Sequence, residues 1–447
     1  MQRKCFINGT IISNAVRQNT DILVDNGIIA ALGDHKAFGL TKDDEIIDCS
    51  GRIILPGIID AHCHIQLDTG IFQTHDGWWN GSQEAARGGI TTVIDFVGPQ
   101  PGEDLRHALD FRLEQAKDSI VDYTFHMTVL DDTEQSLDAI DKCPGWGISS
   151  LKIYTTYRPN YYLDDQAIVR ILERAAKAGL TVLVHCENDA IVTHETARIA
   201  SKDLWRDYPR LRPAIAEVEA AERIIRLADY TGARVVIAHN SSEQTADVVS
   251  QARAEGISVF NETCPQYLFL CDEDNFSNDE PWRFILQPPL RDELALDGLA
   301  QAILADDIDM VITDHCAYTR DEKTANPLAT PGGLPGFETL LPMLASLPDI
   351  TWEQVSCLLC RNPAQIYGLW PHKGAIAPGF DADIIVIRDE TYTIDETQLQ
   401  SFAGYSPFNG HEARGIIERV FRRGEEIIHH GKTLAAQGSG RFFKVGD

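Results

Sequence analysis

Short apolar runs that alternate with helical segments constrain the fold of this chain more than any other feature of its sequence. The runs are rich in β-branched residues, as buried strands are, and the segments between them carry an apolar stripe at helical spacing and end in Gly. In chain order the runs are ITTVIDFV, YTFHMTVL, ISSLKIYTTY, TVLVHCEN, ARVVIAHNS, ISVFNETC and DMVITDHC. The alternation predicts an α/β protein with a TIM-like (β/α)8 barrel over residues 56–372. A doubly wound open sheet is the weaker alternative, since the chain has no glycine-rich dinucleotide or phosphate motif.

Both ends of the chain have a residue pattern that differs from that of the middle. Residues 1–55 and 373–447 alternate apolar and polar residues, with turn signals such as Asn8-Gly9 and Asn26-Gly27. Two β-rich flanks around a barrel predict one small β-sandwich domain that both termini build together.

The charge and composition of the chain disfavour some classes of partner. The formal net charge of −28 disfavours nucleic acid and anionic membrane surfaces, because both would repel the chain. The sequence shows no apolar run of signal-peptide or membrane-spanning type, and its ten cysteines are scattered, as in proteins of a reducing compartment. We therefore expect a cytoplasmic protein that acts on a small molecule.

Metal-ligand residues stand where the predicted strands end. In IIDAHCHIQLD, His62 and His64 are two apart, and alternate strand residues point to the same side, so the two imidazoles converge. The residues at the other strand ends are Lys152, His185, His239 and Asp314. Side chains at the carboxyl ends of barrel strands meet over the core, and imidazole and carboxylate are ligands that zinc-type ions take. Four His and one Asp exceed what one tetrahedral ion uses, which predicts two ions that share a bridging ligand.

Lys152 conflicts with this interpretation as long as its amine is a cation, since two divalent ions would repel it. Reaction of the amine with carbon dioxide would produce an anionic carbamate able to bridge both ions. The alternative is an ordinary lysine that is salt-bridged or extends its ammonium group to water.

Longer motifs also follow one another along the chain. They are PGIIDAHCH, SLKIYTTY, LVHCEN, ETCPQYL, PPLRDE, TDHCAY, GGLPGFETLLPML, NPAQIYGLWPHKGAIAPGFDADIIV and SPFNGHEARG. In this order they resemble the hydantoinase/dihydropyrimidinase family of cyclic amidohydrolases, within the amidohydrolase superfamily. PGIIDAHCH is similar to the family's P-G-x-I-D-x-H-x-H, SLKIYTTY to S-F-K-x-F-x-x-Y and LVHCEN to V-H-A-E-N, while ETCPQYL is identical to a family signature. The resemblance covers nearly the whole chain.

The resemblance implies a dinuclear centre and a reaction. One Zn²⁺ would be held by His62, His64, Lys152 and Asp314, and a second by carboxylated Lys152, His185 and His239. Asp314 would take a proton from water and return it to the leaving nitrogen, and Tyr157 would stabilise the oxyanion. The expected reaction is hydrolysis of a hydantoin or dihydropyrimidine-type ring to an N-carbamoyl amino acid. A homo-oligomer, tetramer or dimer, is also implied, because relatives are commonly tetramers.

Two positions depart from the family pattern. The family usually has Ser before PPLR and Asn before GLPG, where this chain has Gln287 and Gly332. In the family these positions lie near the substrate ring, so the departures leave metal binding intact and bear on the identity of the substrate. Aromatic candidates to line a substrate pocket are Trp78, Trp79, Tyr161 and Tyr162, although packing is the commoner role of such side chains.

Three alternatives stay open at this point. Dihydroorotases of the superfamily carry an Arg shortly after the paired His, where this chain has Gln66, and allantoinases generally lack a Tyr at the position of Tyr157. The third alternative is a non-catalytic scaffold, since some animal relatives keep the fold but have lost the metal ligands, all of which are present here.

Overall fold

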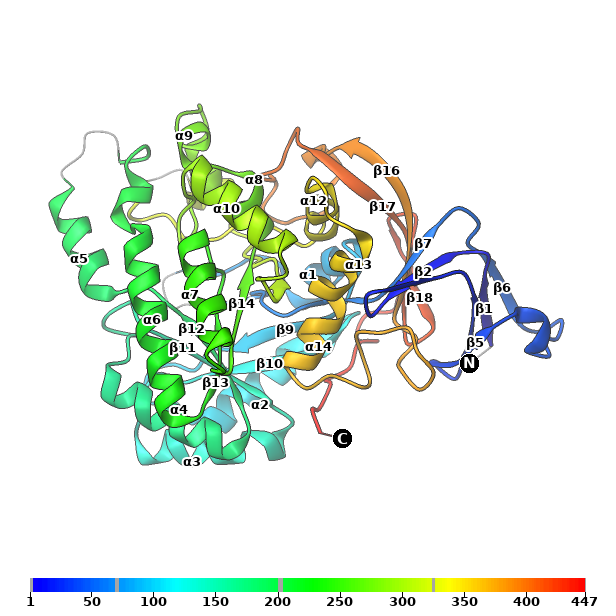
Figure 1. Cartoon of the computed structure of the whole chain (residues 1–447), viewed down its shortest axis with the longest axis horizontal. Coiled ribbons are helices and arrows are strands. Elements are labelled where there is room, and N and C mark those ends of the chain that lie inside the picture. Colours follow the sequence, from blue (N-terminus) through cyan, green and yellow to red (C-terminus); the bar gives the residue numbers. More distant parts are fainter. Residues whose placement is uncertain (1–2, 69–71, 200–203, 324–325, 447) are drawn as a thin grey trace.

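Eight parallel strands form a nearly closed barrel in the computed structural model, which describes residues 3–68, 72–199, 204–323 and 326–446 (Figure 1). The strands are β8 (Ile58–Asp60), β9 (Ile90–Val97), β10 (Asp122–Thr128), β11 (Ser150–Tyr154), β12 (Thr181–His185), β13 (Arg234–Ile237), β14 (Val259–Thr263) and β15 (Met310–Val311). Each strand pairs in parallel with the next along the chain. The ring closes just past β8 and β15, where Asp314 N donates to His62 O and His64 N donates to His315 O, both at 2.9 Å. The predicted barrel is confirmed.

Helices cover the outside of the barrel. The main ones are α1 (Trp78–Arg87), α2 (Leu105–Gln115), α3 (Glu134–Lys142), α4 (Asp165–Ala178), α5 (Asp189–Arg198), α6 (Ala214–Thr231), α7 (Glu243–Ala254) and α10 (Glu293–Leu304). Shorter ones are α8 (Pro265–Phe269), α9 (Asp272–Asn275), α11 (Arg320–Lys323), α12 (Leu340–Ser346), α13 (Trp352–Ser356) and α14 (Asn362–Ile366). Local signals set their ends: the Asp164 side chain caps α4 at Ala167 N, and Gly179, at φ 71°, ends it. Among the described residues, no helix combines the length and apolar character needed to cross a membrane.

Strands from both ends of the chain form two further sheets beside the barrel (Figure 1). The four-stranded sheet has the order β5 (Ile28–Gly33), β4 (Asp21–Asp25), β1 (Lys4–Ile7) and β6 (Glu45–Asp48). The seven-stranded sheet has the order β19 (Lys432–Thr433), β18 (Glu425–His429), β17 (Glu412–Arg422), β16 (Ile384–Thr393), β7 (Ile53–Pro56), β2 (Thr10–Ser13) and β3 (Val16–Gln18). Strand β16, from the C-terminal part, thus pairs with the N-terminal β7. This arrangement confirms that both termini build the second unit.

One core joins these two sheets. Phe6, Ile22 and Ile29 of the smaller sheet pack with Ile384 and Phe421 of the larger one, and all five are buried. The hydrophobic effect over this shared face holds the sheets together as a sandwich.

The two asparagine-glycine signals have different outcomes. Asn26-Gly27 turns the chain between β4 and β5, which pair antiparallel, as expected for a hairpin. Asn8-Gly9 instead carries the chain from β1 in one sheet to β2 in the other.

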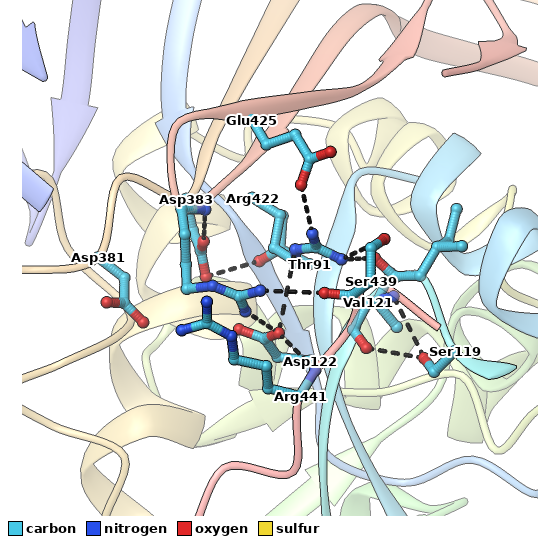
Figure 2. Close-up of polar contacts among 12 residues, drawn as sticks. Thr91, Ser119, Val121, Asp122, Asp381, Asp383, Arg422, Glu425, Ser439 and Arg441 are labelled. Atoms are coloured by element: carbon cyan, nitrogen blue, oxygen red, sulfur yellow. Dashed lines mark hydrogen bonds and ion pairs between the residues drawn. The ribbon is translucent and has the colours of Figure 1, made fainter. Parts of the chain in front are cut away.

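A buried ion network ties the barrel to the terminal sheets (Figure 2). Lys373 Nζ lies 2.9 Å from Asp122 of β10, 2.7 Å from Asp383 and 3.0 Å from Asp381. Arg423, in the turn between β17 and β18, pairs with the same Asp122 carboxylate. The three carboxylates alone would repel one another, and the lysine ammonium takes the place that a metal cation would need. The cluster is therefore a structural joint.

Candidate metal centre and active site

Two histidines and an aspartate meet where the barrel closes. The backbone bonds between the segments after β8 and β15 bring the His62 and His64 imidazoles to the Asp314 carboxylate. Asp314 Oδ1 lies 3.4 Å from His62 Nε2 and 3.2 Å from His64 Nε2. One ligand atom from each residue lies within 4.8 Å of the others, as expected of a site for one cation. Asp314 adopts a φ of 50°, the type of backbone strain that clusters at functional sites.

Lys152, His185 and His239 lie beside this group. Lys152 is in β11, His185 ends β12 and His239 follows β13, so three neighbouring strands deliver them. The His239 ring centre is 5.4 Å from that of His62 and 4.5 Å from that of His185. All six residues predicted as metal ligands line one cavity of about 450 Å³. The structure thus brings together every member of the predicted set.

Burial controls the charge of these side chains. It lowers the pKa of His62 and of His239 well below the usual range, and Lys152 acts in the same direction on both. Both imidazoles are therefore neutral, the form that binds metal ions. Burial also lowers the pKa of Lys152 to about 8, against the opposing effect of Glu262 and Asp314. A lysine with this pKa is partly an uncharged amine near neutral pH.

Two buried glutamates orient the histidines. Glu262 of β14 pairs with His62 Nδ1, which leaves Nε2 on the side of Asp314. Glu187 Oε2 lies 2.6 Å from His185 Nε2, which leaves the Nδ1 atom of that ring for another partner. Outer-shell carboxylates of this kind fix ring orientation in metal sites. Neither glutamate is among the predicted site residues, although the sequence carries two signals: Glu262 is a charged residue inside the apolar run ISVFNETC, and Glu187 stands two positions after His185.

The donor set fits divalent cations. Four imidazoles and a carboxylate share the cavity with Lys152, and the buried Nδ1 atoms of His64 and His239 have no hydrogen-bond partner among the described residues. Buried polar atoms are nearly always satisfied, so unpaired imidazole nitrogens on two residues that line one cavity indicate a ligand. His62, His64 and Asp314 form the candidate metal site of this chain.

Tyr157 lies on the wall of the same cavity. Its ring centre is 4.9 Å from that of His185, and its backbone has a φ of 72°. Burial raises the pKa of its phenol well above the usual range, so the hydroxyl group stays protonated and can donate a hydrogen bond. This placement suits a donor to a substrate oxygen.

Gln287 and Gly332 also line the cavity. The Gln287 Nε2 atom lies 3.4 Å from the Tyr208 hydroxyl, which itself donates to Leu286 O at 3.2 Å. Both positions at which the chain departs from the family pattern therefore belong to one wall of the cavity.

Part of the cavity lining is apolar and aromatic. Leu67, Phe72, Tyr161, Tyr318 and Leu328 contribute to it. The other aromatic candidates have different surroundings. Trp78 is buried against Tyr123 and Phe125, the Tyr162 ring lies 3.4 Å from the Arg158 guanidinium carbon, and Trp79 packs against the barrel core. Tyr161 is thus the one of the four that the structure brings to the cavity.

Comparison with known proteins gives consistent matches over the whole chain. The model of the amidohydrolase family matches residues 53–427. D-phenylhydantoinase of Escherichia coli (strain K12) is 36% identical over 451 residues, which cover 98% of this chain and 97% of that protein.

Solved structures match equally well. Dihydropyrimidinase from Brevibacillus agri superimposes with a TM-score of 0.94 at 29% identity, covering 99% of each chain. D-hydantoinase (dihydropyrimidinase) from Thermus sp. gives a TM-score of 0.95 at 28% identity, again over 99% of each chain.

Proposed function

This chain belongs to the amidohydrolase family as a hydantoinase/dihydropyrimidinase-like hydrolase of cyclic amide C–N bonds, and from that premise we propose that it opens cyclic ureides to N-carbamoyl amino acids. The observation that carries the proposal is the convergence of four histidines, Lys152 and Asp314 with the Tyr157 phenol in one cavity. A ring with an aromatic substituent fits the apolar and aromatic part of the lining, and the name of the E. coli relative supports the same substrate class.

We propose that two divalent ions, Zn²⁺ or similar, occupy this cavity. The first would be held by His62, His64, Asp314 and Lys152, and the second by Lys152, His185 and His239. When bound, such ions polarise an amide carbonyl and make water a nucleophile near neutral pH. Lys152 would serve as a carbamate: its neutral amine forms an N–C bond to carbon dioxide and releases one proton, so that the uncharged side chain becomes an anion. The lowered pKa of this lysine supports the step.

The side chains then carry the proton and bind the oxyanion. Asp314, 3.2 Å from His64 Nε2 and open to the cavity, would accept a proton from the attacking water and deliver it to the ring nitrogen as the C–N bond breaks. Tyr157 would donate a hydrogen bond to the carbonyl oxygen as it gains negative charge. The products are a carboxylate and the carbamoylated nitrogen of the opened ring.

One panel assay tests the proposal. The metal-loaded protein is offered hydantoin, 5-phenylhydantoin, dihydrouracil, allantoin and dihydroorotate, and its metal content is measured on the same sample. Turnover of hydantoins or dihydrouracil is expected. Turnover confined to allantoin or dihydroorotate would establish one of the two rival amidohydrolase activities, and a fully loaded protein inactive on the whole panel would overturn the proposal.

A further inference from the structure

A buried ion pair lies directly behind the cavity. Glu187 follows β12 by two residues, and Arg212 follows a short 3₁₀ helix, Tyr208–Leu211. Arg212 Nη1 donates to Glu187 Oε2, with the two side chains only 9% and 0% exposed. A pair so fully removed from water is costly to break, since the partner left behind is an uncompensated charge.

The same carboxylate oxygen is shared with a histidine of the cavity. Glu187 Oε2 accepts from Arg212 and from His185 Nε2, whereas Glu187 Oε1 has no partner among the described residues. The position of this buried carboxylate therefore depends on Arg212, and the orientation of the His185 ring depends on that carboxylate in turn.

Arg212 also contacts Tyr157. Its guanidinium carbon lies 5.0 Å from the centre of the Tyr157 ring, on the π face, a favourable place for a cation. The centre of the Tyr157 ring also lies 4.9 Å from that of the His185 ring. Because the Tyr157 backbone has a φ of 72°, surrounding contacts must hold it in a conformation that L-residues rarely adopt.

Arg291 and its partners hold the backbone of Arg212. Its backbone carbonyl accepts from Arg291 Nη1 at 2.5 Å, and Arg291 Nε donates to Ser241 Oγ at 2.9 Å. Arg291 Nη2 lies 3.3 Å from the buried Glu217 carboxylate. The backbone of Arg212 is thus held by a buried network, which fixes the point from which its guanidinium reaches Glu187 and Tyr157.

We infer that Arg212 is a positioning residue that sets two groups of the proposed reaction at once, His185 through Glu187 and Tyr157 by stacking on its ring. The inference rests on the proposed function. A purely structural ion pair would stabilise the fold without influencing His185 or Tyr157. In that case the conservative substitution Arg212→Lys would leave kcat at its wild-type value.

Three variants of the full-length, metal-loaded enzyme test the inference. Arg212→Met removes both contacts, so kcat should fall about 10- to 100-fold and the metal content should drop below that of the wild type. Arg212→Lys keeps a charge for Glu187 but loses the planar face, so the metal content should stay near that of the wild type while kcat falls about tenfold, with KM nearly unchanged. The double variant Glu187→Gln, Arg212→Met removes both buried charges and should recover thermal stability but not kcat.

Arg422→Lys is the matched control. Arg422 is also buried and paired, 2.7 Å from Glu425, but it belongs to the joint with the terminal sheets (Figure 2). This variant should lose stability and keep the kcat and metal content of the wild type.

Each outcome decides the inference. Wild-type kcat and metal content in Arg212→Met, with only stability lowered, would overturn it. If that variant does not fold, wild-type kcat in Arg212→Lys, or full recovery of kcat in the double variant, would overturn it equally. If the wild type itself opens no cyclic ureide, the proposed function fails, and the metal content of the variants still decides whether Arg212 positions His185.

Discussion

Gly332 lies directly against Gln287 in the wall of the cavity. A Cβ atom at residue 332 would stand 3.2 Å from Gln287 Cγ and 3.3 Å from Gln287 Cδ, closer than side chains normally approach. The two positions where this chain departs from its family pattern are therefore neighbours in space. The larger glutamine occupies room that any side chain at residue 332 would need, so the two departures compensate each other.

This contact predicts strong coupling between the two residues. Gly332→Asn alone should lower kcat/KM for hydantoin about 10- to 100-fold, because the new side chain displaces Gln287 into the cavity. Gln287→Ser alone should cost about tenfold through a looser wall. The double variant should regain most of the loss, with a coupling energy of about 1–3 kcal/mol from a double-mutant cycle of kcat/KM values. Additive losses would show that the two positions act independently.

Tyr157→Phe should lower kcat while KM stays close to that of the wild type. The phenol donates only to an oxygen that gains charge during the reaction, and loss of one such donor costs about 100- to 1,000-fold in kcat. Tyr161→Phe is the matched control, because Tyr161 lines the same cavity and has no part in the proposed reaction. Steady-state kinetics on one hydantoin measure kcat and KM of both variants. Equal losses of kcat in the two variants would show that Tyr157 does not stabilise the oxyanion.

Lys152→Ala should abolish both carbamate formation and metal retention. Without the bridging anion the cavity keeps neutral imidazoles and one carboxylate, so the metal content should fall and kcat should drop at least about 100-fold. Labelled bicarbonate should give a carbamate carbonyl signal by NMR in the wild type and none in this variant. Addition of a short carboxylic acid should restore part of the activity by replacing the missing anion.

Lys323 provides the control for that experiment. It is the second buried lysine whose pKa burial lowers, here to about 7, but its Nζ donates to the carbonyls of Ile285 and Gly333, at 2.8 and 2.5 Å. Lys323→Met should therefore keep the carbamate signal. Loss of the signal in this variant, with its retention in Lys152→Ala, would show that Lys323 and not Lys152 carries the carbamate.

Periodicity and strand ends predicted much of this molecule. A buried strand and an amphipathic helix are encoded by neighbouring residues, so the barrel could be derived from its alternating runs. The convergence of His62 with Asp314 followed from one rule, that parallel strands of a barrel end on the same side.

Contacts between distant loops could not be predicted in this way. Arg212 and Glu187 lie in separate segments, and the local sequence around each gives no sign that the Arg212 guanidinium reaches the Glu187 carboxylate. The same holds for Gly332 and Gln287, whose contact depends on how two irregular segments cross. Such contacts follow from the packing of the folded chain, where side-chain volume and the pairing of buried charge select among many loop conformations.

The joint between barrel and terminal sheets predicts a specific acid dependence of stability. Burial would raise the pKa of Asp122, but Lys373 and Arg423 outweigh it and lower this pKa to about 2. Because the pKa is lower in the folded protein, the ionised carboxylate stabilises the fold at pH values above its usual pKa. That stabilisation, about 2 kcal/mol, is lost as the pH falls from about 4 to about 2.

Asp122→Asn should therefore destabilise the protein by at least about 2 kcal/mol at pH 7, because Lys373 and Arg423 both lose a buried carboxylate partner. The variant should also lose less stability than the wild type on acidification. Urea unfolding at pH 7 and pH 3 measures both effects. Asp229→Asn, at an exposed position of α6, makes the same chemical change without a buried partner and should follow the wild type at both pH values. If Asp122→Asn and the wild type lose equal free energy of unfolding between the two pH values, the Asp122 carboxylate is not held ionised by its cationic neighbours, and the joint depends on packing alone.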